Sequence, residues 1–317
     1  MFTLGINKYR KIDIRALVAA VLLLVLITQT AVCKEQAWQR YQSTYFIANS
    51  NASHKKTLTI LKELELFRAA AVQVVNLHLP ESAEKTAVLI LKTKKEFRSL
   101  GYGRNVAAFA MYHNGQFLIV MPAAGDLDWA KSVVRHEYSH VLLGYSKIRF
   151  PQWYNEGLAE LLSAVDFRDR DTTFTVGETP GRIKGTSGNS FDWNTLIADG
   201  FDRSMNIKNV SSAYLQSWLL THYVMLGEDF SNTPKLHEYL RLTNAGQPSL
   251  LAFEQAFGMD GNELWVRKLQ SYSKRLFYVV YDFRPGALHT DFERSSSDVA
   301  EVESLLDQIR ARAIAYE

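Results

Sequence analysis

The stretch His136-Glu137-Tyr138-Ser139-His140 has the spacing of a metal-binding motif on a helix, and the expected fold is built around it. Its two histidines are four residues apart, so on an α-helix both imidazoles project from one face and can bind one metal ion. Glu137 lies next to that face. A hydrolytic zinc site needs this arrangement, because two neutral nitrogens hold the ion and a neighbouring carboxylate takes a proton from water. The motif is short enough to occur by chance, so the flanking sequence has to supply a helix and a third ligand.

Apolar residues recur at helical spacing on both sides of the motif and predict a helix that ends near Gly144. These residues are Trp129, Val133, Val134, Val141 and Leu142. A loop precedes the helix, and either Asp126 or Asp128 is expected to cap it. The pattern therefore places the histidine motif inside an amphipathic helix.

A second helix, predicted from Trp153 to Leu162, carries two candidates for the third ligand. Glu156 and Glu160 are four residues apart and share one helical face. Either could reach a metal held by the preceding helix, and a carboxylate oxygen is a suitable donor for Zn²⁺. The residues alone leave the choice between them open.

The order of these motifs resembles that of the gluzincin metallopeptidases, especially the peptidase MA-like family. The likeness rests on the histidine motif followed by Asn155-Glu156-Gly157 at the head of the second helix. It implies a Zn²⁺ cofactor with Glu156 as the third ligand, and a role for Glu160 in orienting a ligand histidine. The spacing is shorter than in the zinc aminopeptidases, so Glu160 remains the alternative ligand.

The resemblance extends to the segment before the zinc helix. In gluzincins a strand at the sheet edge binds the substrate backbone by strand addition. The residues in the matching place are Ala107, Ala108, Phe109, Ala110 and Met111. The Asn114-Gly115 pair that follows predicts a hairpin turn between this strand and the next.

Two residues downstream, Tyr214 and His222, are candidates for the site. The helix around Tyr214 resembles the one that carries the transition-state tyrosine of the aminopeptidases, which makes Tyr214 a candidate donor to a developing oxyanion. The alternative is that Tyr214 is an ordinary packing aromatic. His222 lies two helical turns further along and is expected to be a packed histidine, because no neighbouring residue completes a ligand set.

The first 33 residues have the layout of a signal peptide. Basic residues precede an apolar run from Ala16 to Ile27, and small residues at Ala31 and Cys33 suit cleavage after Cys33. This predicts an exported protein, periplasmic or secreted. An uncleaved anchor over residues 16–28 is the alternative, and it would tether the same domain outside the membrane. Cys33 is the only cysteine, so an intramolecular disulfide is excluded.

Charge argues against a nucleic-acid partner. Residues 1–33 hold four basic residues and one acid, so this segment has a net charge of +3. The whole chain also has a net charge of +3, so the net charge of the remaining residues is near zero. Such a chain has no basic surface of the kind that binds phosphate backbones. The expected partner is a peptide or protein substrate, with membrane contact only through the N-terminal segment.

The remaining pattern predicts an α+β protein of zincin-like plan, with the active-site cleft between an N-terminal mixed α/β lobe and a mainly helical C-terminal lobe. The expected parts are an α/β lobe at 34–165, a polar loop and hairpin region at 166–209, a helical lobe at 210–275 and a tail with a strand and a helix at 276–317. The predicted hairpin pairs 172–177 with 182–185. Helices are predicted at 57–77, 213–226, 233–242, 250–257 and 262–274.

Together these features predict an exported zinc metallopeptidase in which Glu137 is the general base. The alternative is a zincin-fold binding or scaffold protein that keeps a zinc site with little or no turnover.

Overall fold

The computed structural model describes residues 38–76, 85–102, 106–124, 127–181, 183–185, 191–198, 200–201, 207–284 and 291–314. The predicted signal segment lies outside this part of the chain, as do Asp126 and the side chains of Asp128 and Trp129. None of the described helices combines the length and hydrophobicity that a membrane crossing requires. Helices and strands are mixed, in agreement with the predicted α+β class.

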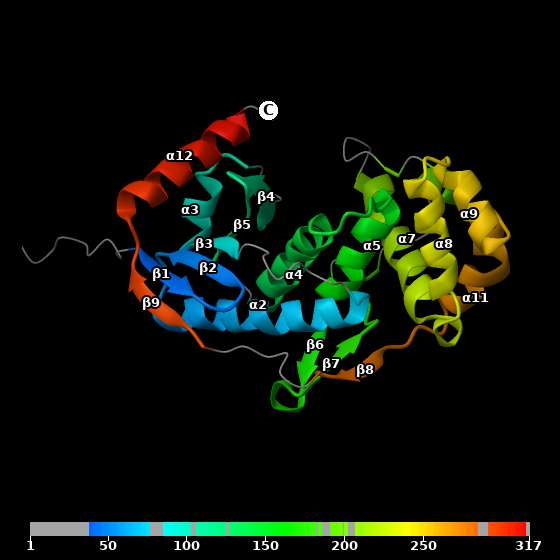
Figure 1. Ribbon diagram of the computed structural model, residues 1–317, viewed down its shortest axis with the longest axis horizontal. Helices are drawn as coiled ribbons and strands as arrows, with labels where there is room; N and C mark the ends of the chain where they lie inside the picture. The colour runs from blue at the N-terminus through cyan, green and yellow to red at the C-terminus, as the bar shows by residue number, and fades with distance from the viewer. Residues whose placement is uncertain are drawn as a thin grey trace, which may run out of the picture. The chain divides into compact units, whose positions relative to one another are not determined.

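One mixed sheet has the strand order β4-β5-β3-β2-β1-β9 (Figure 1). Its strands are β1 (Gln39–Gln42), β2 (Phe46–Ser50), β3 (Thr86–Leu91), β4 (Phe109–His113), β5 (Gln116–Pro122) and β9 (Glu293–Ser296). β2, β3 and β5 run parallel, whereas β4 is antiparallel to β5 and β1 is antiparallel to both of its neighbours. β4 therefore forms one edge of this sheet.

Helices cover both faces of this sheet, and alternate side chains of β3 point into two different cores. Val88 and Ile90 point into the larger core, which also contains residues of α2 (His54–Val75) and α4 (Leu127–Gly144). Leu89 and Leu91 point into a second core with α3 (Lys94–Arg98) and α12 (Val299–Ile314). A strand buried on both faces has a continuous apolar sequence, as β3 does.

The helical part follows α4 in the chain. Its helices are α5 (Gln152–Ser163), α6 (Trp193–Ala198), α7 (Ile207–Leu226), α8 (Thr233–Asn244), α9 (Ser249–Phe257), α10 (Gly261–Leu264) and α11 (Gln270–Tyr272). α5 packs closely on α7, because a Cβ atom at Gly157 would lie 2.2 Å from the carbonyl oxygen of Ser217. The glycine after Glu156 thus brings α7 against the helix that carries the candidate ligand.

A small second sheet has the order β6-β7-β8, formed by β6 (Asp166–Arg168), β7 (Thr173–Val176) and β8 (Val279–Asp282). The predicted hairpin between 172–177 and 182–185 is therefore wrong, since β7 pairs with β6 and β8 and residues 183–185 lie in a turn. The reason is aromatic packing: Phe174 stacks on Tyr281 with the ring centroids 5.3 Å apart. No strand at 182–185 could offer Phe174 such a partner.

The C-terminal segment returns from the helical part to the first sheet (Figure 1). The strand and the helix predicted for residues 276–317 are found as β8 and α12. The sequence patterns did not indicate β9, which pairs with β1, or the packing of α12 on the sheet. These residues complete the N-terminal sheet instead of forming a separate tail.

Candidate metal site

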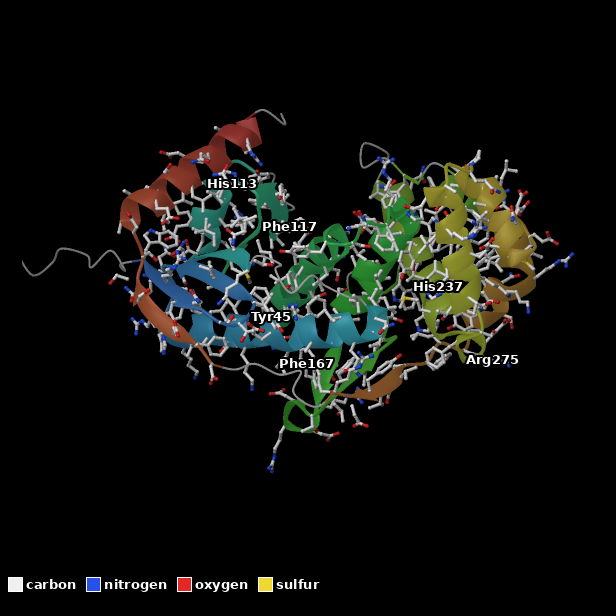
Figure 2. All side chains as sticks on the ribbon, in the orientation of Figure 1. Tyr45, His113, Phe117, Phe167, His237 and Arg275 are labelled. Atoms are coloured by element: carbon white, nitrogen blue, oxygen red, sulfur yellow. The ribbon has the colours of Figure 1, made fainter. Side chains whose placement is uncertain are left out.

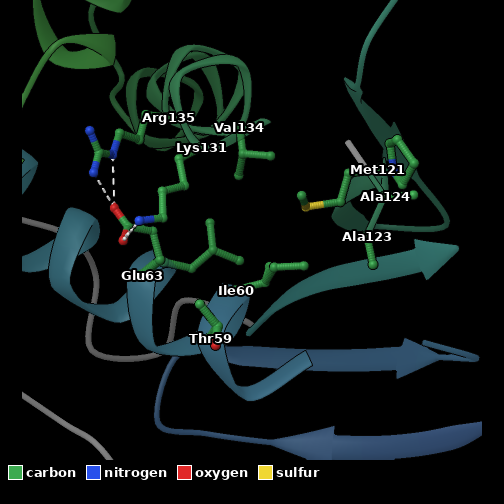
Figure 3. Close-up of a pocket in the computed structure, with 11 residues that line it drawn as sticks. Thr59, Ile60, Glu63, Met121, Ala123, Ala124, Lys131, Val134 and Arg135 are labelled. Carbon is green, nitrogen blue, oxygen red and sulfur yellow. Dashed lines mark hydrogen bonds and ion pairs between the residues drawn. The ribbon is translucent and has the colours of Figure 1, made fainter. Parts of the chain in front are cut away.

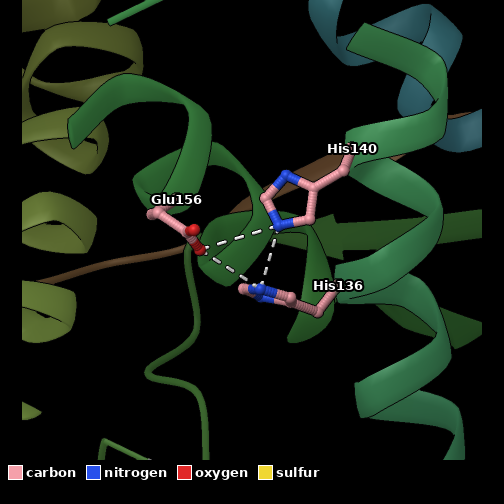
Figure 4. Close-up of side chains that lie close together, drawn as sticks. All are labelled: His136, His140 and Glu156. Atoms are coloured by element: carbon pink, nitrogen blue, oxygen red, sulfur yellow. Dashed lines mark hydrogen bonds and ion pairs between the residues drawn. The ribbon is translucent and has the colours of Figure 1, made fainter. Parts of the chain in front are cut away.

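The two histidines of the motif and one glutamate converge between α4 and α5 (Figure 4). The Nε2 atoms of His136 and His140 are 3.2 Å apart. Oε2 of Glu156 lies 3.4 Å from the first and 3.6 Å from the second. His136 and Glu156 are buried, while the side chain of His140 is 24% exposed and forms the open side of the group. The group is able to hold a metal ion.

These distances suit a tetrahedral zinc ion. With metal–ligand bonds of about 2.0–2.2 Å, two ligands of a tetrahedral Zn²⁺ are about 3.3–3.6 Å apart. The three measured separations, 3.2, 3.4 and 3.6 Å, lie close to that range. Two imidazole nitrogens and one carboxylate oxygen are also the donor set of catalytic zinc sites, which leave a fourth position for water or substrate.

The outer nitrogen of each histidine faces a polar side chain of α5. Nδ1 of His140 is 2.9 Å from Oδ1 of Asn155, and Nδ1 of His136 is 3.5 Å from Oε1 of Glu160. Because an amide oxygen only accepts hydrogen bonds, this contact favours the His140 tautomer with its proton on Nδ1, which leaves the Nε2 lone pair facing the site. This arrangement favours Glu156 as the ligand and Glu160 as an orienting residue. Asn155 belongs to the Asn155-Glu156-Gly157 segment, but the sequence pattern alone does not indicate its contact with His140.

The opposite side of α4 holds the helix in place. Tyr138 is buried against Phe46 and Phe67, with ring centroids 5.1 and 6.1 Å away, and this burial raises the pKa of its phenol. Arg135 donates to Oε1 of Glu63 on α2 and to the carbonyl oxygen of Val165, just after α5. One guanidinium therefore connects α4 to both neighbouring helices.

A cavity of about 20 Å³ lies beside this ion pair (Figure 3). Lys131 adds a second cation, 3.5 Å from Oε2 of Glu63. Apolar side chains such as Ile60, Val134 and Met121 form most of the remaining lining. The cavity contains none of the candidate ligands, and its volume is only about that of one water molecule. It belongs to the packing of α4 on α2, not to the metal site.

Tyr214 of α7 lies beside His136, one of the candidate ligands. Its ring centroid is 6.4 Å from that of His136, and it packs edge-on against Phe201 at 5.0 Å. Glu137, the predicted general base, is half-buried on α4. The structure thus brings Tyr214 to the same site as the histidine motif.

The predicted substrate strand is found at the sheet edge as β4, but it begins at Phe109. Ala107 and Ala108 precede the strand, which corrects the predicted start. In the β4–β5 register, Ala107 would stand opposite Pro122, which has no N–H to donate to the ladder. The Asn114-Gly115 turn is confirmed, with φ angles of 48° and 83°.

His222 is a fully buried histidine away from the ligand group, as expected for a packed residue. Nδ1 lies 2.7 Å from the Tyr272 hydroxyl, and Nε2 lies 3.0 Å from the carbonyl oxygens of both Gly177 and Phe277. Burial lowers the pKa of the imidazole, and its two carbonyl hydrogen bonds oppose that shift. His222 therefore joins α7 to the end of β7 and to the segment that leads into β8.

The geometry assigns a metal-binding group to His136, His140 and Glu156. Comparison of the chain with protein-family models and with curated proteins finds no match.

Proposed function

We propose that the protein is an exported zinc metallopeptidase of gluzincin type, with a zincin-like fold and its cleft between the α/β and helical parts. The observation that carries the proposal is the convergence of three donor atoms, from His136, His140 and Glu156, at tetrahedral spacing. Zn²⁺ bound by this group would supply a Lewis acid that activates water and polarises a peptide carbonyl. Export rests on the signal-like sequence of residues 1–33.

The side chains around the donor atoms have separate tasks in this proposal. Glu137 accepts a proton from the attacking water and passes it to the leaving nitrogen. Asn155 and Glu160 orient His140 and His136, and so keep Nε2 of each ring aimed at one point. Tyr214, beside His136, donates a hydrogen bond from its hydroxyl group to the developing oxyanion.

The first test is metal content. Purified protein is expected to contain about one zinc per chain, because the chain offers one such group among its described residues. His140→Ala removes one of three ligands and should lose the zinc. His237→Ala, at an exposed histidine of α8, is the matched control and should retain it. Absence of zinc from the unmodified protein would refute the proposed site.

The second test is the general base. Glu137→Gln keeps the size of the side chain but cannot accept the proton, so kcat on peptides should fall by about 10²–10⁴-fold while zinc is retained. Glu303→Gln, at an exposed position of α12, should keep full activity. Full activity of the Glu137→Gln protein would show that another group is the base.

The two tests also separate the alternative role. A protein that binds zinc but cleaves no peptide from a diverse library would support the binding or scaffold function. The presence of a carboxylate directly after His136 favours hydrolysis, because a structural zinc site does not need one.

A further inference from the structure

The stripe of α4 that carries the two ligand histidines continues to Gly144. Residues 136, 140 and 144 are spaced by four and so lie on one helical face. At Gly144 the missing side chain makes room for a ring from β5, because a Cβ atom there would lie 2.7 Å from Cζ of Phe117. The Phe117 ring therefore rests on the ligand-bearing face at Gly144, which is about 6 Å, or one helical turn, along the axis from His140.

Phe117 belongs to an aromatic cluster with Tyr112 of β4 and Tyr145, the residue after α4. Its ring makes edge-on contacts with both tyrosines, with centroids 5.0 Å apart in each case. Tyr112 is 59% exposed, so the cluster presents a ring to solvent. Figure 2 shows Phe117 at the β4–β5 hairpin, on the side of the sheet where α4 lies.

The backbone of β4 offers hydrogen-bonding groups beside this cluster. His113 and Gln116 flank the two-residue turn and form a hydrogen-bonded pair, so Ala110 and Tyr112 fall in the alternate positions whose N–H and C=O groups point away from β5. The carbonyl oxygen of Tyr112 already accepts a hydrogen bond from Arg312 of α12 at 3.1 Å, so a peptide is expected to pair through Ala110 and the N–H of Tyr112. The side chain of Ala110 packs against the same core as α4, which puts it on the face of β4 that Tyr112 shares.

We propose that the aromatic cluster of Tyr112, Phe117 and Tyr145 is a specificity subsite that binds one aromatic or large aliphatic side chain of a peptide paired with β4. The proposal rests on the peptidase function proposed above. A peptide added at the edge places alternate side chains on the α4 face, where one lies against Tyr112. One helical turn from His140 corresponds to about two residues of an extended strand, so this side chain lies within about two residues of the scissile bond.

The experiment measures peptide binding to zinc-loaded protein that carries Glu137→Gln, so that hydrolysis does not consume the probe. The probes are fluorescent, end-blocked hexapeptides of alanine in which each position in turn is Phe, Leu, Ser or Asp. At one position, Phe and Leu are expected to bind at least about tenfold more tightly than Ser. Tyr112→Ala should abolish that preference, and Tyr112→Phe should retain it.

Gly144→Ala gives an independent arm of the same experiment. Its methyl group displaces the Phe117 ring, so the preference for Phe and Leu should weaken although no side chain of the cluster is removed. Tyr278→Ala, at another exposed tyrosine (48%), should leave the preference unchanged.

The outcomes distinguish this subsite from the proposed hydrolysis. Preferential binding that depends on Tyr112 in a protein that cleaves nothing would support the subsite and refute the peptidase function. Cleavage by the protein with Glu137 intact, but with the same side-chain preference after Tyr112→Ala and Gly144→Ala, would overturn the subsite alone. Failure of the zinc-loaded protein to bind any of the peptides would also overturn it.

Discussion

One hydrogen bond at His140 determines which of its nitrogens faces the candidate metal. Asn155 accepts from Nδ1 at 2.9 Å, and Nε2 is left to coordinate. Asn155 directly precedes Glu156, so a single turn of α5 supplies both a ligand and the group that orients another ligand. A shift of α5 would therefore displace the ligand Glu156 and the orienting residue Asn155 together.

We predict that Asn155→Ala weakens zinc binding by about 10–100-fold, the usual effect of losing an orienting partner. Asn155→Asp is the matched control, because its carboxylate still accepts from Nδ1 and should keep most of the affinity. Competition with a chromophoric chelator would measure both constants. Equal affinities for the unmodified protein and the alanine variant would show that the hydrogen bond does not orient His140.

At the scale of elements, the site depends on how α4 is held between α2 and α5. Arg135 and Glu63 are both largely buried, with side-chain exposures of 11% and 13%. The guanidinium also lies over the ring of Phe167, 5.0 Å from its centroid. These contacts hold α4, which carries His136 and His140, in place beside α5, which carries Glu156.

We predict that Arg135→Gln lowers the free energy of unfolding by about 2 kcal/mol, because Glu63 loses a nearby charge and the Val165 carbonyl loses a donor. The same substitution at Arg310, which forms an exposed pair with Asp307, should change stability by less than about 0.5 kcal/mol. Urea unfolding followed by tryptophan fluorescence would measure both. Similar values for the two variants would contradict the anchoring role.

Across the whole molecule, the segments at the two ends of the described chain complete the N-terminal sheet. β9 pairs with β1, and α12 covers the sheet face that α2 and α4 leave open. Trp38, Leu89, Leu118 and Ile309 come from widely separated positions and share one core. The second core of the first sheet therefore contains residues from both ends of the described chain.

We predict that Ile309→Ala destabilises the protein by about 3 kcal/mol, since it removes a fully buried side chain and leaves a cavity under α12. Gln308→Ala, at the neighbouring exposed position, should have little effect. Urea titration would compare them, and amide hydrogen exchange in β1 and β2 should accelerate in the Ile309 variant alone. A loss below about 1 kcal/mol would mean that α12 contributes little to the sheet.

Local patterns predicted most of the regular elements. Helical periodicity placed a helix at 57–77, where α2 runs from His54 to Val75. The Asn-Gly turn was found where both of its residues need positive φ. These signals are local, because each depends on residues that are neighbours on one helix face or one turn.

The sequence by itself determined the two histidines and their helix, the neighbouring carboxylates of α5, and the hairpin that begins with the edge strand β4. Only the tertiary structure decided that Glu156 faces the histidine Nε2 atoms while Glu160 faces Nδ1 of His136. The same holds for the partners of β7, the return of β9 and α12, and the place of Phe117 on Gly144. Residues distant in the chain settle these contacts, and their pairing follows from shared burial and register, which local propensity does not encode.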